Sequence, residues 1–149
     1  MDTIGLQMKF PEGFYRMEDG KRHRYYPWKG RPDMVWENHE GVQVTGQAAG
    51  QKVKISEIVP AAEAARKMTE NIFPQYRFSP VYLCETGELP IGWFRMQMQD
   101  RGMEHIKAFT VIDHEMIMLT FTYPDAEAIK WKSIILSSFG TWREFHGAD

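Results

Sequence analysis

The fold of this chain is decided by residues 115–142, EMIMLTFTYPDAEAIKWKSIILSSFGTW, which predict one strand, one turn and one helix. Apolar side chains alternate through the first part of this stretch. One face of a pleated strand would carry Ile117, Leu119, Phe121 and Tyr123, and the other Met116, Met118, Thr120 and Thr122. Because both faces are largely apolar, we expect this strand at the centre of a sheet.

The strand is expected to end at Tyr123-Pro124-Asp125, because proline cannot donate a hydrogen bond to a neighbouring strand. Asp125 is predicted to cap the helix that follows by accepting a backbone N–H. The apolar spacing then changes to three and four residues, which is the period of a helix. The stripe that should pack on the sheet consists of Ala128, Trp131, Ile135, Phe139 and Trp142.

Length and composition favour one domain over residues 1–149. A chain of 149 residues is long enough to bury a proper hydrophobic core. The formal net charge of -2 gives no general attraction to nucleic acid or to anionic membranes. Cys84 is the only cysteine, which excludes an internal disulfide and a zinc site with several thiolate ligands.

No stretch of the sequence carries a recognisable signal for export or membrane insertion. The first residues, MDTIGLQMKFPEGF, lack a basic start followed by a continuous apolar run. No segment approaches the roughly 18 apolar residues of a membrane span. If Met1 is the native start, we expect a cytoplasmic protein without a membrane partner.

Upstream of residue 115, short strands are expected before a helix and further strands after it. The early strands are predicted at Phe14–Met17, Met34–Glu37 and Gly41–Thr45. Most of Lys21–Arg31 is placed in a loop because it contains Pro27 and Gly30. Residues 46–50 lack the glycine spacing of a phosphate-binding loop, and we expect an ordinary loop there after the preceding strand.

A helix should begin near Ser56, a favourable N-cap, and end at about Ile72 before Phe73-Pro74. Its buried stripe is predicted to be Ile58, Ala61, Ala62, Ala65, Met68 and Ile72. Three strands then follow, at Phe78–Glu85, Ile91–Gln99 and Met103–Ile112. Their connections are too short for parallel crossovers, so they form an antiparallel meander with the strand at residue 115. The predicted fold class is α+β, a mainly antiparallel sheet flanked by helices in an α/β/α sandwich.

Two short motifs, Leu119-Thr120-Phe121-Thr122-Tyr123-Pro124 and Ile135-Leu136-Ser137-Ser138-Phe139, occur within this order of elements. From about Met34 onward, the chain resembles the Mog1/PsbP-like family of small α/β/α sandwich proteins. The resemblance implies a non-catalytic protein, because known members include a nuclear-transport GTPase-binding factor and an extrinsic photosystem subunit. It supplies no catalytic residues to transfer, and neither of those specific functions is carried over.

The segment Lys21–Arg31 mixes cations with aromatic side chains, a composition typical of protein interfaces and of nucleic-acid grooves. Nearby acidic residues weaken its field, so we do not expect nucleic acid as the partner. The residues predicted to bind an unidentified protein are Arg22, Arg24, Tyr25, Tyr26, Trp28 and Lys29. The alternative is a solvated loop whose aromatic side chains fold back onto the sheet.

No residue pattern predicts an enzyme, a cofactor or a metal site. The five histidines, His23, His39, His105, His114 and His146, show no paired spacing of metal ligands. Asp113-His114 is interpreted as a turn between strands. Cys84 is expected to be buried and inert, because a nucleophile would need a base held beside it.

The leading hypothesis is therefore a non-enzymatic adaptor or accessory domain that binds another protein. The alternative is a small-molecule-binding domain with an apolar pocket between the sheet and a helix. That pocket would be lined by Trp93, Phe94, Met96 and Met98 beneath the helix at 56–72. An exposed edge strand near Met34–Thr45 could also pair across a homodimer.

Overall fold

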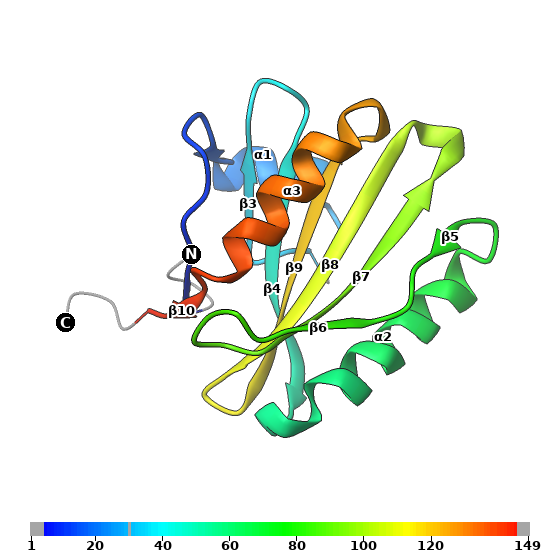
Figure 1. Cartoon of the computed structure of the whole chain (residues 1–149). Helices are drawn as coiled ribbons and strands as arrows, with labels where there is room; N and C mark the ends of the chain where they lie inside the picture. The colour runs from blue at the N-terminus through cyan, green and yellow to red at the C-terminus, as the bar shows by residue number, and fades with distance from the viewer. Residues whose placement is uncertain (1–4, 30, 146–149) are drawn as a thin grey trace.

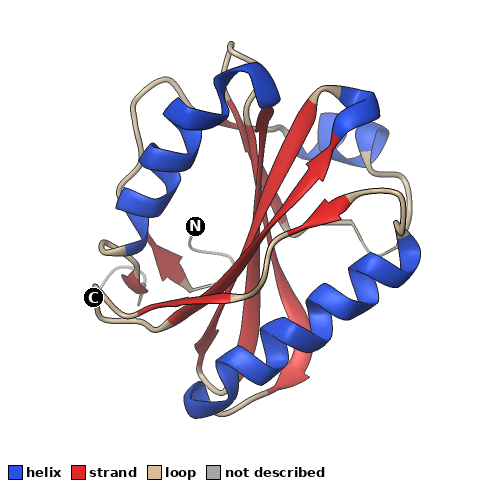
Figure 2. Cartoon of the chain, turned by 45° about the vertical axis from the view of Figure 1, so that its right-hand side comes forward, coloured by secondary structure: helices blue, strands red, loops and turns tan. Residues whose placement is uncertain are grey.

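The structure is a computed structural model that describes residues 5–29 and 31–145. An antiparallel sheet forms its middle layer, with helix α2 (Ile58–Ile72) on one face and helix α3 (Ala128–Phe139) on the other (Figure 1). Figure 2 shows the two long helices on opposite sides of the strands. The predicted α+β class and the α/β/α sandwich are both confirmed.

Eight strands of the described residues make up the main sheet, in the spatial order β2-β3-β4-β9-β8-β7-β5, with β6 also paired to β7. They are β2 (Tyr15–Arg16), β3 (Met34–Glu37), β4 (Gln43–Lys52), β5 (Arg77–Phe78), β6 (Tyr82–Cys84), β7 (Ile91–Met98), β8 (Met103–Ile112) and β9 (Glu115–Pro124). A separate pair, β1 (Leu6–Gln7) with β10 (Arg143–Glu144), joins the two ends of the described chain.

Strand β9 lies at the centre of the sheet, as its two apolar faces predict. It pairs with β4 on one side and with β8 on the other. Its residues Leu119 and Phe121 are fully buried against the α3 stripe of Trp131, Ile135 and Phe139. The opposite face of β9 contributes Met116 to a second core beneath α2.

The transition from β9 to α3 differs from the prediction at Asp125. A 3-10 turn, η4 (Asp125–Glu127), precedes the helix, and the Asp125 carboxylate caps nothing. The backbone N–H of Asp125 instead donates to the carbonyl of Gly102 at 2.9 Å. Glu127 binds the start of the helix, because its carboxylate accepts from Trp131 Nε1 at 3.1 Å.

Two strand predictions were wrong in extent. Residues 46–50, expected as a loop, continue β4 to Lys52, with a bulge between Ala48 and Lys52. The expected strand at Phe78–Glu85 is divided into β5 and β6, which pair with different parts of β7. Pro80 lies between them and has no N–H to donate, which accounts for the interruption.

Helix α2 buries less of its apolar stripe than the spacing predicts. Only Ile58 and Ala62 are buried, whereas Met68 and Ile72 are 62% and 66% exposed. The N-terminal half of α2 packs closely on β7 at Ala62 and Gly92. A side chain on Gly92 would be crowded, because its Cβ would lie only 3.1 Å from the Ala62 Cβ. Glycine at this position lets the helix approach the strand, and the last two turns leave the sheet partly uncovered.

A buried carboxylate, Glu104 of β8, binds three neighbouring side chains near the start of α3. It accepts two hydrogen bonds from Arg95, at 2.9 and 3.0 Å, and one each from Gln97 and the Tyr123 hydroxyl. Burial favours the neutral form of this carboxyl group, but the hydrogen bonds outweigh burial and lower its pKa. Burial also raises the pKa of the Tyr123 hydroxyl, which therefore stays a donor.

We expect Glu104→Ala to lower the free energy of unfolding by about 3–5 kcal/mol, because it leaves Arg95 without its buried partner. Urea titration at neutral pH measures this difference. The exposed Glu63→Ala is the control and should change stability by less than about 0.5 kcal/mol. Because the pKa of Glu104 lies below its ordinary 4.5, the difference should shrink as the pH falls below that value. A loss under about 1 kcal/mol at neutral pH would contradict this role.

Candidate functional site

The segment predicted to bind a protein begins as a helix, α1 (Asp19–Tyr25), and not as a loop. Pro27, on which the loop prediction depended, comes after the helix and so does not interrupt it. Asp19 lies in its first turn and Arg22, His23 and Arg24 in its last, an arrangement that suits the helix dipole.

Two of the six predicted binding residues serve to hold this segment in place. The Arg22 guanidinium donates to the carbonyl of Pro32 at 2.7 Å. The Tyr26 hydroxyl donates to the side-chain oxygen of Gln43 in β4 at 3.0 Å, and the Tyr26 carbonyl accepts from Arg31 Nε at 2.8 Å. Both side chains are therefore structural supports.

The other four predicted residues are exposed, and we call them the α1 surface: Arg24, Tyr25, Trp28 and Lys29. Tyr25 is 62% exposed and Trp28 is 54% exposed. The Trp28 ring meets the Tyr26 ring edge to face at 5.3 Å, and the Lys21 ammonium lies 5.5 Å from the centre of the Tyr25 ring. Lys21 is itself paired with Glu37 of β3 at 3.1 Å.

The strand expected to be a free edge, at Met34–Thr45, is not one. Strand β2 pairs with the outer side of β3 at Trp36 and Glu37, and the N–H of Met17 donates to the carbonyl of Val35 at 2.8 Å. No free ladder is left along most of β3 for a second copy of the chain to extend.

Among the described residues, the histidines and the cysteine do not converge on one place. His23 and His39 are exposed, and the His39 ring lies beside Tyr15 at 5.3 Å. His146 lies outside the described residues. Cys84 is partly exposed, contrary to the prediction, with its sulfur 3.3 Å from the Thr86 hydroxyl oxygen.

Asp113 and His114 form the predicted turn between β8 and β9. Both have positive φ, 52° and 66°, as a two-residue hairpin turn of the primed type requires. They line a cavity of about 570 Å³ together with Lys54 and Glu88. In residues 5–29 and 31–145, no group of three or more His, Cys, Asp or Glu side chains is placed to hold a metal ion. Within the same ranges, every helix is too short or too polar to cross a bilayer.

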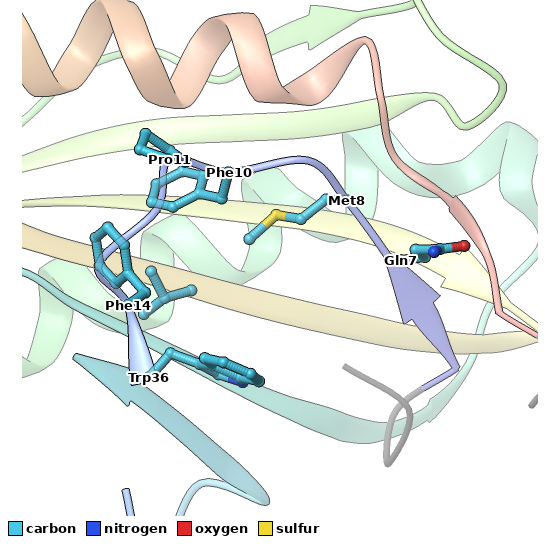
Figure 3. Close-up of a pocket in the computed structure, with 7 residues that line it drawn as sticks. Gln7, Met8, Phe10, Pro11, Phe14 and Trp36 are labelled. Carbon is cyan, nitrogen blue, oxygen red and sulfur yellow. The ribbon is translucent and has the colours of Figure 1, made fainter. Parts of the chain in front are cut away.

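A second cavity, of about 380 Å³, lies on the α3 side of the sheet beneath the segment that connects β1 to β2 (Figure 3). Phe10 and Phe14 pack edge to face at 5.0 Å along one wall, with Trp36 of β3 on another. The Trp36 indole N–H is buried and has no hydrogen-bond partner among the described residues. Gln7 is the polar side chain of this lining.

A third cavity, of about 400 Å³, opens between the sheet and the C-terminal end of α2, and we call it the α2 cavity. It is lined by Thr69, Ile72, Phe73, Tyr76, Met96, Met98, Arg101, Met103, His105, Lys107 and Thr122. The pocket predicted beneath this helix was right for Met96 and Met98. It was wrong for Trp93, which packs on Phe139 of α3, and for Phe94, which is fully buried in the core beneath α2.

The floor of the α2 cavity is polar because two cross-strand rows meet there. One row contains Thr122 and His105, and the next contains Thr120 and Lys107. The Lys107 ammonium donates to the Thr120 hydroxyl oxygen at 3.2 Å. Burial lowers the pKa of Lys107 to about 8. Burial, with the nearby charges of Lys107 and Arg101, lowers the pKa of His105 to about 3, and its buried Nδ1 has no partner among the described residues.

Sequence reasoning missed Lys107 and assigned His105 to no site. The two residues are two positions apart on β8, so their side chains point to the same face. That face also carries the apolar Phe109 and Val111. The sequence signal for this site was the alternation of His105 and Lys107 with the core positions Phe109 and Val111. This spacing does not show that α2 leaves that part of the sheet uncovered.

We expect Lys107→Met to stabilise the folded chain at pH 7, because it removes a charge that is partly desolvated. The pKa of Lys107 is about 8 when folded against an ordinary 10.5, so wild-type stability gains from deprotonation as the pH rises from 8 to 10.5. The advantage of the variant should therefore fall by about 1 kcal/mol or more between pH 7 and pH 10. Urea titrations of both proteins measure it, with the exposed Lys67→Met as control. If the difference in unfolding free energy between the two proteins is the same at pH 7 and pH 10, the lowered pKa of Lys107 is contradicted.

Two solved structures have a fold similar to that of this chain. The solution structure of cyanobacterial PsbP (CyanoP) from Synechocystis sp. PCC 6803 matches 97% of this chain and 89% of that chain, with a TM-score of 0.65 and 10% identity. A crystal structure from Bacteroides thetaiotaomicron VPI-5482 matches 97% of this chain and 47% of that chain, with a TM-score of 0.54 and 11% identity. No family model matches the sequence, and no curated protein matches it either. At these identities the likeness concerns architecture alone: the chain has a PsbP-like fold.

Proposed function

We propose that this chain is a non-enzymatic accessory or adaptor domain that binds another protein through the α1 surface. The observation that carries the proposal is the exposure of Tyr25 and Trp28 on a segment that the side chains of Arg22 and Tyr26 hold to Pro32 and to Gln43 of β4. Large aromatic side chains at the surface cost little conformational entropy when they become buried in an interface. Tyrosine, tryptophan and arginine are also the residues that most often dominate binding energy.

The supports of the α1 surface make it a prearranged platform. Arg22 and Tyr26 fix the helix and the turn after it to Pro32 and Gln43. The edge-to-face contact between Tyr26 and Trp28 limits the positions open to the tryptophan ring. A partner would therefore bind a surface that is already close to its bound shape.

The two exposed cations of the α1 surface itself favour a partner with acidic residues. Lys21 is neutralised by Glu37, but Arg24 and Lys29 are exposed cations beside the two aromatic side chains. Cations at the rim of an interface increase the association rate with an acidic partner and make it depend on salt. Tyr15 of the edge strand β2 is 40% exposed and could extend the aromatic contact area for a partner.

The non-enzymatic part of the proposal rests on where the reactive side chains lie. His105 and Lys107 share the α2 cavity, but in the part of the chain that the structure describes no carboxylate lines that cavity to act with them. Glu104 is on the opposite face of the sheet and is bound by Arg95, Gln97 and Tyr123. The family that the sequence resembles also includes proteins that act by binding, and we expect this one to work in the cytoplasm.

We expect the double variant Tyr25→Ala/Trp28→Ala to reduce recovery of the bound partner at least tenfold, because it removes the two exposed anchors and leaves Arg22 and Tyr26 in place. The measurement is affinity capture from an extract of the source organism with wild type and variant at equal loading. The recovered protein is then purified and its Kd measured against both.

The matched control is Tyr82→Ala/Ile129→Ala, which removes two exposed apolar side chains elsewhere. It should recover as much partner as the wild type. Raising the salt concentration should weaken wild-type binding, because Arg24 and Lys29 are solvent-exposed. Equal recovery by wild type and by the Tyr25/Trp28 variant would show that the partner binds elsewhere.

A further inference from the structure

We propose that the α2 cavity is a binding site for a small amphipathic monocarboxylate, a molecule with a short apolar chain and one carboxylate group, held by Lys107. This site lies under the C-terminal end of α2 and shares no residue with the α1 surface. It would give the domain a small-molecule ligand in addition to a protein partner.

The cavity has the size and the apolar wall that such a ligand needs. Its volume of about 400 Å³ lies at the small end of the roughly 300–1,000 Å³ range of ligand sites. The apolar wall is made of Ile72, Phe73, Tyr76, Met96, Met98 and Met103. Phe73 and Tyr76 stack at 5.8 Å, and the three methionines can adapt to chains of different shape.

The charge of the cavity selects an anion. Among the described residues, its lining holds the cations Lys107 and Arg101 beside a neutral His105 and includes no Asp or Glu side chain. Lys107 donates to Thr120, but an ammonium has three protons, so donors remain for a ligand. A cationic ligand would be repelled by Lys107 and Arg101.

His105 supplies an observation that does not depend on charge. Its Nδ1 is buried and bonds to none of the described residues, although buried polar atoms are nearly always hydrogen-bonded. His105 and Lys107 lie two residues apart on one face of β8, which separates their Cα atoms by about 7 Å. Both residues belong to the lining of the cavity, so a polar group bound at Lys107 would lie close to the His105 ring.

The ligand can enter over the end of α2. Ile72 and Phe73, 66% and 38% exposed, belong to the lining and also face solvent. An apolar chain that lies along them would cover side chains that the sheet does not. The wall would thus give a role to the exposed apolar side chains at the C-terminal end of α2.

The test uses octanoate as the probe, with octanol and octylammonium as uncharged and cationic probes of equal chain length. Each is titrated into the full chain, and the methionine methyl signals are followed by NMR. We expect octanoate to shift Met96, Met98 and Met103 saturably, with at least tenfold higher affinity than octanol. Octylammonium should not bind.

Lys107→Met should reduce the affinity for octanoate at least tenfold and leave the affinity for octanol unchanged. Lys67→Met, on the exposed face of α2, should change neither, and Tyr25→Ala/Trp28→Ala should bind octanoate as the wild type does. Equal binding of octanoate and octanol by the wild type overturns the proposal, and so does the absence of octanoate binding. Shifts at Met8, in the cavity of Figure 3, without shifts at the three methionines would also overturn it.

Discussion

The structure depends on one constraint, which is that β9 has apolar side chains on both faces and must be covered on both. Leu119 and Phe121 point to the α3 side and Met116 to the α2 side. A strand of this kind is stable only inside a sheet with a layer on each face. The ladders to β4 and β8, and the placement of α2 and α3 on opposite faces, all satisfy this constraint.

The two covering layers are unequal, and the candidate ligand site follows from that difference. Helix α3 buries Trp131, Ile135 and Phe139, so its face of the sheet forms a continuous core. Helix α2 buries only Ile58 and Ala62. The part of the sheet that α2 leaves uncovered is where β8 and β9 carry polar side chains, including Lys107. Burial lowers the pKa of Lys107, so we expect its charge to cost stability at neutral pH unless a counter-charge binds there.

Most of the fold could be predicted because strand alternation and short connections are local properties. The predicted span of β8 was right at both ends, and the predicted position of β9 was right as well. Predictions failed where a contact distant in sequence decides the outcome. Pairing with β9 extends β4 through residues 46–50, and the supporting roles of Arg22 and Tyr26 depend on partners 10 and 17 residues away. The mixed cationic and aromatic composition of Lys21–Arg31 was enough to select Tyr25 and Trp28 as candidate binding residues. Lys107 became a candidate only once the structure showed that α2 does not cover it.

The two proposed sites lie on the same face of the sheet. One row of directly paired residues crosses the sheet from Glu37 through Gln43 and Thr122 to His105. Glu37 and Gln43 bind Lys21 and Tyr26 of the α1 region, and Thr122 and His105 line the α2 cavity. A shared row of side chains does not by itself couple two sites, because coupling needs an element with two alternative arrangements. Continuous pairing of β4 with β9 and of β9 with β8 along this row gives a rigid floor. The sheet would therefore act as a scaffold that holds the two proposed sites at a fixed separation, and we expect binding at each to depend on its own side chains.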